Sequence, residues 1–214
     1  MMGDPDESEP SQAAVWDQRY AESDRVWSGN PNGALVAEVA GLPPGRAFDV
    51  GCGEGADAIW LAERGWVVTA LDVSQVALDR AKAAADERGV TVTWLCTGLI
   101  EASLPPGGFD LVSAQYPAVP RTDGALAEHA MLDAVAPGGT LLVVHHVDFG
   151  SHQSAGHHFD PERFVHVEDV HALLGPEWSI EVYEERDRDV QSGAGAGHTR
   201  DRVLRARRVG DPAP

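Results

Sequence analysis

The run from Asp49 to Ala56, DVGCGEGA, constrains the fold of this chain more than any other stretch. It follows the apolar residues 46–50 and precedes a helical pattern. Its glycines, Gly51, Gly53 and Gly55, accept positive φ angles and have no Cβ, so the backbone can turn sharply and come close to a ligand. The run therefore predicts a strand, a tight ligand-facing turn and a helix.

The charges beside these glycines separate two kinds of ligand. The glycines and Ala56 also satisfy the dinucleotide pattern G-x-G-x-x-G/A, so the glycines alone leave NAD open. The turn carries Asp49, Glu54 and Asp57 but no Lys or Arg from residue 47 to residue 63. A pyrophosphate is bound by N–H donors away from carboxylates, whereas carboxylates stabilise the sulfonium and ammonium of S-adenosylmethionine. Asp49 is predicted to meet the amino group of a methionyl moiety.

A further acidic residue ends the apolar run from Val67 to Val73. The dinucleotide-fold rule places an acid on the ribose hydroxyls about 20 residues after the glycines, and Asp72 can accept from both hydroxyls. Helix capping is the alternative role for Asp72, but Ser74 is the better N-cap for the helix predicted over residues 75–88. Asp72 is therefore predicted to bind ribose.

Strand-like and helical patterns alternate along most of the chain, which is typical of an α/β protein with a doubly wound sheet. The last two strand patterns are joined by a flexible Gly-Ala linker and indicate an antiparallel hairpin at one sheet edge. Residues 1–12 are acidic and lack an apolar face, so we expect a disordered tail before a single domain. Strands are predicted over residues 46–50, 67–73, 90–96, 109–115, 140–147, 179–186 and 201–208, and helices over residues 57–64, 74–88 and 123–135, after Asn30-Pro31 as far as Gly41, and within residues 160–174.

The net charge and the cysteine content limit which binding partners and which cellular compartment the sequence predicts. The net charge of −18 repels phosphodiester backbones and anionic membrane surfaces, which favours small-molecule partners and argues against nucleic acid and membranes. Cys52 and Cys96 are the only cysteines, so we expect no disulfide framework and a reducing compartment. The sequence shows no leader-like start and no run of transmembrane length. These features predict a cytoplasmic protein and leave its oligomeric state open.

With residues 49–55 as a glycine-rich first motif and Asp72 as a second, the chain resembles the class I S-adenosylmethionine-dependent methyltransferases. The segments WDQRY (16–20) and VWSGNPN (26–32) resemble its small-molecule branch, which includes tellurite-resistance and thiopurine-type enzymes. The resemblance implies a Rossmann-like sheet of seven strands in the order 3-2-1-4-5-7-6, with the last strand antiparallel. It also implies one domain over residues 13–210, an N-terminal helical lid at about residues 13–42, and S-adenosylmethionine as cofactor.

The resemblance also assigns cofactor-binding residues. Aromatic residues of the lid would enclose the sulfonium by cation–π attraction, or alternatively fasten the N-terminal helix to the core. The branch usually has an Asp-Leu pair after the third strand for the adenine amino group, whereas this chain has Gly98-Leu99, so that contact falls to backbone groups or to Glu101. The implied cofactor-binding residues are Trp16, Tyr20, Trp27, Asp49, Gly51, Cys52, Gly53, Asp72, Val73, Gly98, Leu99 and Gln115.

Tyr116, His145 and His146 are the predicted catalytic residues. Gln115-Tyr116-Pro117 ends the fourth strand, at the sheet edge where open α/β proteins bind ligands, and lacks the Asn/Asp-Pro-Pro-aromatic form of amino-group methyltransferases. The two histidines end the fifth strand, where a neutral imidazole can deprotonate a hydroxyl or thiol acceptor. Histidines also stand at positions 152, 157 and 158, but no helical His or Cys-His spacing supports a metal site, so none is predicted.

Two other functions remain open at this point. A nicotinamide-dependent oxidoreductase would use the same glycines and Asp72. A non-catalytic nucleoside-binding protein is suggested by Gly98, where an acid is usual in the resembled branch. The charges of the turn favour methyl transfer from S-adenosylmethionine to a small molecule, through an S, O, N or chalcogen acceptor atom that the sequence does not identify.

Overall fold

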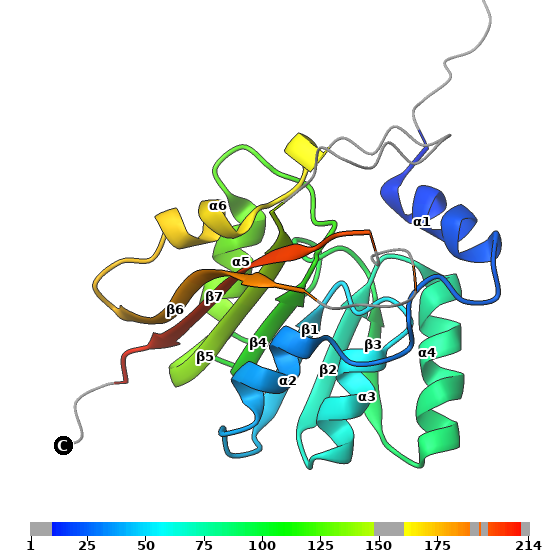
Figure 1. Cartoon of the computed structure of the whole chain (residues 1–214), viewed down its shortest axis with the longest axis horizontal. Coiled ribbons are helices and arrows are strands. Elements are labelled where there is room, and N and C mark those ends of the chain that lie inside the picture. The colour runs from blue at the N-terminus through cyan, green and yellow to red at the C-terminus, as the bar shows by residue number, and fades with distance from the viewer. Residues whose placement is uncertain (1–9, 148–160, 189–192, 194–196, 211–214) are drawn as a thin grey trace, which may run out of the picture.

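The computed structural model describes residues 10–147, 161–188, 193 and 197–210. Seven strands form one sheet in the order β3-β2-β1-β4-β5-β7-β6 (Figure 1), which confirms the predicted order. Strands β1 to β5 pair in parallel, and β7 runs antiparallel to both β5 and β6. The strands are β1 (Arg46–Val50), β2 (Val67–Asp72), β3 (Val92–Cys96), β4 (Phe109–Gln115), β5 (Val135–His146), β6 (Trp178–Asp187) and β7 (Arg200–Arg208).

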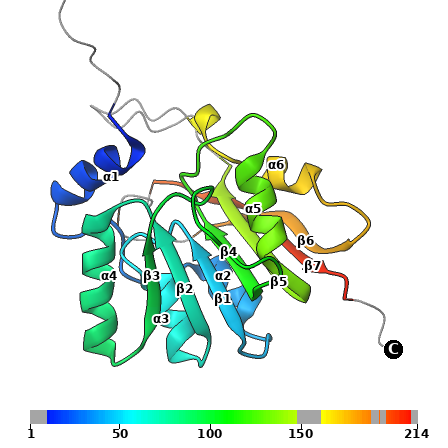
Figure 2. The same cartoon turned by 180° about the vertical axis from the view of Figure 1, so that it is seen from behind.

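Helices cover both faces of the sheet, as a doubly wound fold requires. Helices α2 and α3 pack on one face and α5 and α6 on the other (Figures 1 and 2). Helix α4 lies beside α3, and α1 packs against α4. No helix of the described residues is long and apolar enough to cross a membrane. The helices are α1 (Gln12–Ala21), α2 (Gly33–Val39), α3 (Ala56–Glu63), α4 (Gln75–Arg88), α5 (Leu126–Ala134) and α6 (Val167–Ala172), with a 3-10 turn η1 (Pro161–Arg163).

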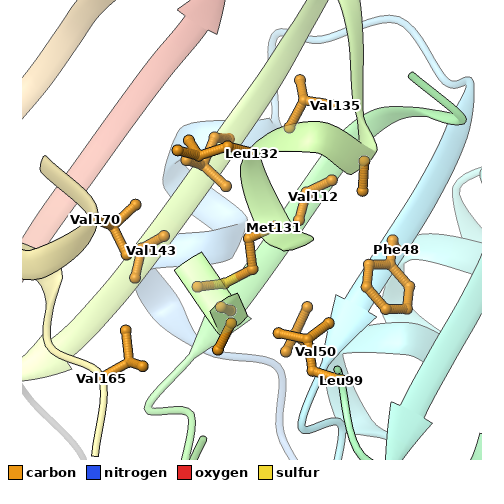
Figure 3. Close-up of a cluster of buried hydrophobic side chains, with 14 of the residues drawn as sticks. Phe48, Val50, Leu99, Val112, Met131, Leu132, Val135, Val143, Val165 and Val170 are labelled. Atoms are coloured by element: carbon orange, nitrogen blue, oxygen red, sulfur yellow. The ribbon is translucent and has the colours of Figure 1, made fainter. Parts of the chain in front are cut away.

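Two apolar clusters fill the space between the sheet and its helices. Figure 3 shows the cluster on the α5–α6 face, where Met131 and Leu132 of α5 and Val170 of α6 meet Val112 and Val143 of the sheet. Because both faces are buried, the central strands are nearly continuous apolar runs, which is typical of parallel strands. On the opposite face, α2 and α3 bury Leu35, Val39, Trp60 and Leu61.

The structure corrects three predicted element boundaries. Strand β5 begins at Val135, not at residue 140, because the chain enters the sheet directly after α5 and a register shift opposite β4 absorbs the turn at residues 137–139. Helix α2 begins at Gly33 with Asn32 in the N-cap position, so Asn30-Pro31 is not its start. The helix predicted within residues 160–174 is a 3-10 turn followed by the short α6. The histidine-containing loop at residues 148–158 lies outside the described residues.

The ligand-facing turn has the backbone geometry that its glycines predict. Gly51, Gly53 and Gly55 have φ angles of 68°, 52° and 82°. A Cβ at Gly55 would lie 2.8 Å from the Cβ of Ala81 and 2.9 Å from Cη2 of Trp94. Glycine at position 55 therefore allows α4 and β3 to approach the start of α3.

Replacing Gly55 by Ala should destabilise the protein more than replacing Gly89, which has a φ of 67° but nothing within 4 Å of its Cβ position. Both variants place a Cβ in the left-handed region, at a cost of about 1–2 kcal/mol. Gly55→Ala adds an overpacking cost of roughly 1–3 kcal/mol. Urea unfolding measures the loss in free energy of unfolding for each variant. Equal losses would show that Ala81 and Trp94 shift to accommodate the added Cβ without an energetic cost.

Candidate functional site

Asp72 connects the glycine turn to helix α4. Its Oδ2 accepts the Gly53 N–H at 2.8 Å and its Oδ1 accepts the Ser74 N–H at 2.9 Å. The Ser74 hydroxyl accepts the Ala77 N–H at 3.1 Å and caps α4, as predicted. Burial raises the pKa of Asp72. Each carboxylate oxygen keeps a second lone pair, so these bonds leave Asp72 able to accept from ribose hydroxyls.

Two of the three acids in the glycine turn bind the N-terminal segment of the chain. Glu54 accepts the backbone N–H groups of Val26 and Trp27, with Oε2 at 3.3 and 3.1 Å. Asp57 accepts the backbone N–H and the side-chain amide of Asn32, both at 2.7 Å. Glu54 and Asp57 are therefore engaged by donors from a distant segment, which leaves Asp49, the acid predicted to meet the amino group, as the acid of the turn to consider next.

Arg80 of α4 supplies a positive charge that the turn itself lacks. Its Nη1 lies 2.9 Å from Oε1 of Glu54, and its Nη2 donates to the carbonyls of Tyr20 and Ser23, each at 2.7 Å. We call this arrangement the Glu54–Arg80 clamp. It fixes the segment between α1 and α2 onto the glycine turn.

Asp49 is the acid of the turn that keeps an unsatisfied oxygen. The residue is 2% exposed, and its Oδ2 has no hydrogen-bond partner within the part of the chain that the structure describes. Burial raises the pKa of Asp49 most, and the negative charges of Asp57 and Asp72 raise it further, while a hydrogen bond from the Ala58 backbone opposes them. A buried carboxylate with a free lone pair and acidic neighbours suits a cationic N–H donor.

Tyr20 and Trp27 lie over the middle of the glycine turn. Trp27 Nε1 donates to the Tyr20 hydroxyl at 2.8 Å, and a Cβ at Gly53 would lie 2.8 Å from that hydroxyl and 3.2 Å from Trp27 Nε1. The Trp16 ring lies 6.0 Å from the Tyr20 ring, and the Arg19 guanidinium lies 5.0 and 5.6 Å from the Trp16 and Trp27 rings. The structure thus places Tyr20 and Trp27 at the turn and Trp16 beside Tyr20.

A second group of polar side chains lies where β4 and β5 end and β7 begins. Tyr116, with a φ of 52°, donates its hydroxyl to Oδ2 of Asp201 at 2.6 Å. The His146 ring stacks on Tyr116 at 4.3 Å and on His198 at 3.8 Å, and its Nδ1 lies 3.1 Å from Oδ1 of Asp201. Arg188 Nε lies 3.5 Å from Asp201 Oδ2 and 3.2 Å from the Tyr116 hydroxyl. We call these five residues the His146–Asp201 cluster.

His145 has a different environment from its neighbour. Its Nδ1 accepts the backbone N–H of His146 at 2.9 Å, and its ring is hydrogen-bonded to the backbone of Pro117. Because proline has no N–H, that partner is the carbonyl, and the His145 Nε2–H donates to it. Burial, followed by the nearby histidines, lowers the pKa of His145 to about 3. His145 is therefore neutral near pH 7 with both ring nitrogens engaged.

Three further predicted residues lie at the end of β4 and after β3: Gln115, Leu99 and Gly98. Gln115 is buried and its Nε2 donates to the Ser113 hydroxyl at 3.0 Å. Leu99 is buried in the cluster of the α5–α6 face. The Glu101 carboxylate occupies the space that a side chain at Gly98 would enter, so an acidic group stands beside this glycine.

Two predicted residues lie at the ends of β1 and β2. Cys52 is half-buried, and its N–H donates to the Leu71 carbonyl at 2.9 Å. Burial and the charges of Asp49 and Asp72 raise the pKa of the Cys52 thiol, so it stays protonated at neutral pH. Val73 is half-buried. Gly51 approaches the loop after β4, since a Cβ there would lie 3.9 Å from Cα of Pro117.

Sequence reasoning missed Arg80, Arg188 and Asp201. Asp201 lies opposite His146 in the antiparallel register of β5 and β7, and only that register would have paired them. Arg80 is 26 residues from Glu54, and no local pattern signals the contact. No group of three His, Cys, Asp or Glu side chains suited to a metal ion occurs among the residues that the structure describes.

Residues 47–139 match a family model described as a methyltransferase domain. The match extends from β1 through α5 and β5's first residues, and so includes the glycine turn and Asp72. This segment, which is less than half of the chain, is similar to that family, and the sheet around it has the strand order of class I S-adenosylmethionine-dependent methyltransferases. The cofactor of the family is S-adenosylmethionine.

Curated relatives carry the same family name. An uncharacterized methyltransferase of Mycobacterium tuberculosis is 34% identical over 122 residues, which are 56% of this chain and 61% of that protein. The 2-heptyl-1-hydroxyquinolin-4(1H)-one methyltransferase of Mycobacteroides abscessus is 32% identical over 123 residues, which are 55% of this chain and 54% of that protein. The chain thus spans 54% to 61% of the length of these relatives.

Solved structures agree on the fold. A structure from work on the conversion of a disulfide bond into a thioacetal group during echinomycin biosynthesis is 26% identical, with a TM-score of 0.74 and 95% of each chain covered. TehB from Haemophilus influenzae is 15% identical, with a TM-score of 0.64, 82% of this chain covered and 62% of TehB. The likeness to TehB shows the fold alone.

Arg80→Gln should release the segment between α1 and α2. Hydrogen bonds to charged groups contribute about 1.5–3 kcal/mol, so chymotrypsin should cut after Tyr20 or Trp27 roughly 10- to 100-fold faster. Arg88→Gln is the matched control, because Arg88 lies on the same helix and pairs with Glu63 at 2.9 Å, away from that segment. Equal cutting of the two variants would show that the clamp does not hold the segment.

Asp49→Asn should stabilise the ligand-free protein at neutral pH. Since burial raises the folded pKa of Asp49, the wild type loses stability as pH rises from the unfolded pKa through the raised folded pKa. Asparagine does not titrate, so the advantage of the variant should be small at low pH and grow across that window. Urea unfolding at a series of pH values measures it, with the exposed Asp110→Asn as control. A variant that is less stable at pH 7 would contradict the assignment.

Proposed function

We propose that the protein transfers a methyl group from S-adenosylmethionine to a small-molecule acceptor. The observation that carries the proposal is the unsatisfied buried oxygen of Asp49 beside a glycine turn that has no basic residue of its own. In this proposal Asp49 accepts from the ammonium of the methionyl moiety and Asp72 accepts from the ribose hydroxyls. Backbone groups of Gly51 and Gly53 contact the ligand closely, and Glu101 beside Gly98 serves the adenine amino group.

The acids of the turn weigh against the nicotinamide alternative. A pyrophosphate placed against this turn would meet Asp49, whose carboxylate already has Asp57 and Asp72 as neighbours, and like charges at close range repel. Arg80, which contacts the turn through Glu54, is engaged by that carboxylate and by backbone carbonyls. A sulfonium and an ammonium gain from the same acids.

The names of relatives support a small acceptor. Besides the hydroxyquinolinone methyltransferase, they include ubiquinone biosynthesis O-methyltransferases, one of them from Saccharophagus degradans at 31% identity, and the glycine N-methyltransferase of Rattus norvegicus at 30% identity. The structure related to echinomycin biosynthesis concerns sulfur chemistry. The net charge of −18 supports a partner other than nucleic acid or an anionic membrane.

We also propose how the chain is organised around this activity. Residues 13–210 act as one domain, and the segment at about residues 13–42 closes over the cofactor through Trp16, Tyr20 and Trp27. Cys52 and Cys96 are both unpaired, which supports a cytoplasmic location.

Methyl transfer to a panel of acceptors tests the proposal. The panel contains phenols, aryl thiols, selenide, heterocyclic amines, tRNA and DNA oligomers, with methyl-labelled S-adenosylmethionine as donor. We expect label in one small-molecule class and none in the oligomers. Label confined to an oligomer would overturn the small-molecule acceptor.

Asp72→Ala should weaken the binding of S-adenosylhomocysteine. Loss of charge-assisted bonds to two hydroxyls costs on the order of 2–3 kcal/mol, or roughly 30- to 150-fold in affinity. Calorimetric titration measures the change, and Asp79→Ala, at an exposed acid of the neighbouring helix, is the control. Unchanged affinity in a folded Asp72→Ala protein would remove Asp72 from the ribose site.

A further inference from the structure

The hydrogen bonds of the His146–Asp201 cluster fix the tautomer of His146. An ionised carboxylate only accepts hydrogen bonds, so the His146 Nδ1 that lies 3.1 Å from Asp201 Oδ1 carries the proton. In the neutral ring the lone pair is then on Nε2. Asp201 is 6% exposed and also accepts the Tyr116 hydroxyl at 2.6 Å. His146 is therefore a base that an adjacent buried carboxylate orients and can stabilise when it gains a proton.

The other two predicted catalytic residues, His145 and Tyr116, are excluded as bases by their own bonds. The Nδ1 lone pair of His145 accepts a backbone N–H at 2.9 Å, and its Nε2–H donates to the Pro117 carbonyl. The Tyr116 hydroxyl donates its proton to Asp201, and burial with the charge of Asp201 raises its pKa. Of the three predicted catalytic residues, only His146 combines an oriented ring with a lone pair that these bonds leave unused.

The cluster lies next to the proposed cofactor turn. Tyr116 follows β4 directly, its N–H donates to the Val144 carbonyl at 2.8 Å, and its left-handed φ of 52° is strained for a residue with a Cβ. The following residue, Pro117, approaches Gly51. The residue after Tyr116 thus reaches the carboxyl end of β1, where the glycine turn begins, and the cluster lies at the same edge of the sheet, at the carboxyl ends of β4 and β5.

We propose that His146 is the general base for a hydroxyl acceptor of the phenol class, that Asp201 is its positioning residue, and that Tyr116 and Arg188 hold Asp201 in place. This assignment rests on the proposed function. The acceptor O–H bond breaks and its proton passes to His146 Nε2 as the acceptor oxygen bonds to the methyl carbon. The carbon–sulfur bond breaks, and its electron pair stays on sulfur, which becomes a neutral thioether. An aryl thiol such as thiophenol is far more acidic than phenol and largely ionised near neutral pH, so it needs no such base.

Charged and titratable groups surround His146 on each packed element. Asp201 of β7 lies at its Nδ1, His198 and Tyr116 stack on its two faces, and His145 meets it edge-on at 5.9 Å. Arg188 contacts Asp201 and so influences His146 indirectly. The Asp201 carboxylate holds the His146 ring by its Nδ1–H, so its loss should leave the ring free to turn and its lone pair no longer aimed at the acceptor.

Matched acceptors, phenol and thiophenol, test the base directly. His146→Gln should lower the rate with phenol by about 10²- to 10⁴-fold relative to the rate with thiophenol. His129→Gln, at an exposed histidine of α5, should leave both rates unchanged. Asp201→Asn should lower kcat for phenol while leaving its KM nearly unchanged, and Asp201→Glu should restore part of kcat. Equal losses with the two acceptors in His146→Gln would overturn the proposal.

Two further measurements keep this test separate from the proposed function. Calorimetric titration with S-adenosylhomocysteine reports the cofactor site, and absence of binding by the wild type would defeat the proposed function itself. Binding without methylation of phenol would defeat the hydroxyl acceptor alone. Nitrogen-15 NMR of the histidines in the wild type needs no variant to fold: we expect His146 as the Nδ1–H tautomer and His145 as the Nε2–H tautomer, and the reverse pattern would overturn the proposal.

Discussion

The fold of this protein depends on how a cluster of buried carboxylates is satisfied at one glycine turn. Asp49, Asp57 and Asp72 are all less than a tenth exposed, and a buried charge is costly unless donors reach it. Asp72 receives two N–H groups, from its own turn and from the start of α4, and Asp57 receives two donors from Asn32. Asp49 retains one free oxygen. The hydrogen bonds of Asp57 and Asp72 therefore hold the turn in place, whereas the free oxygen of Asp49 has no donor. Such an oxygen is expected in a site that binds a cation.

The same acids connect the ligand site to the N-terminal segment. Glu54 and Asp57 bind backbone donors that lie before β1, and Arg80 ties that segment to α4. Movement of the segment consequently requires breaking contacts made by the glycine turn itself. Under the proposed function, a cation bound at Asp49 changes the charge around these contacts, which would couple cofactor occupancy to the position of the segment.

The sequence predicted those features that depend on neighbouring residues. The glycine turn, the Ser74 cap and the strand order follow from local pattern and from the family resemblance, and the structure confirms them. It could not predict contacts set by long-range packing. The contact of Glu54 with Arg80 was missed because Arg80 stands on another element, and Asp201 was missed because its place opposite His146 depends on the register of an antiparallel pair. The predicted start of helix α2 was wrong for the same reason. Asp57, which lies outside that helix, accepts the Asn32 N–H and holds Asn32 in the N-cap position.

The central claim is that Asp49 binds the ammonium of the amino-acid part of the cofactor. Calorimetric titration of the wild type and Asp49→Asn with S-adenosylhomocysteine and with 5′-methylthioadenosine, which lacks that part, tests it most directly. A charge-assisted hydrogen bond is worth about 1.5–3 kcal/mol, so the variant should bind S-adenosylhomocysteine roughly 10- to 100-fold more weakly and methylthioadenosine with nearly unchanged affinity. An equal loss for both ligands, or no loss for either, would contradict the claim.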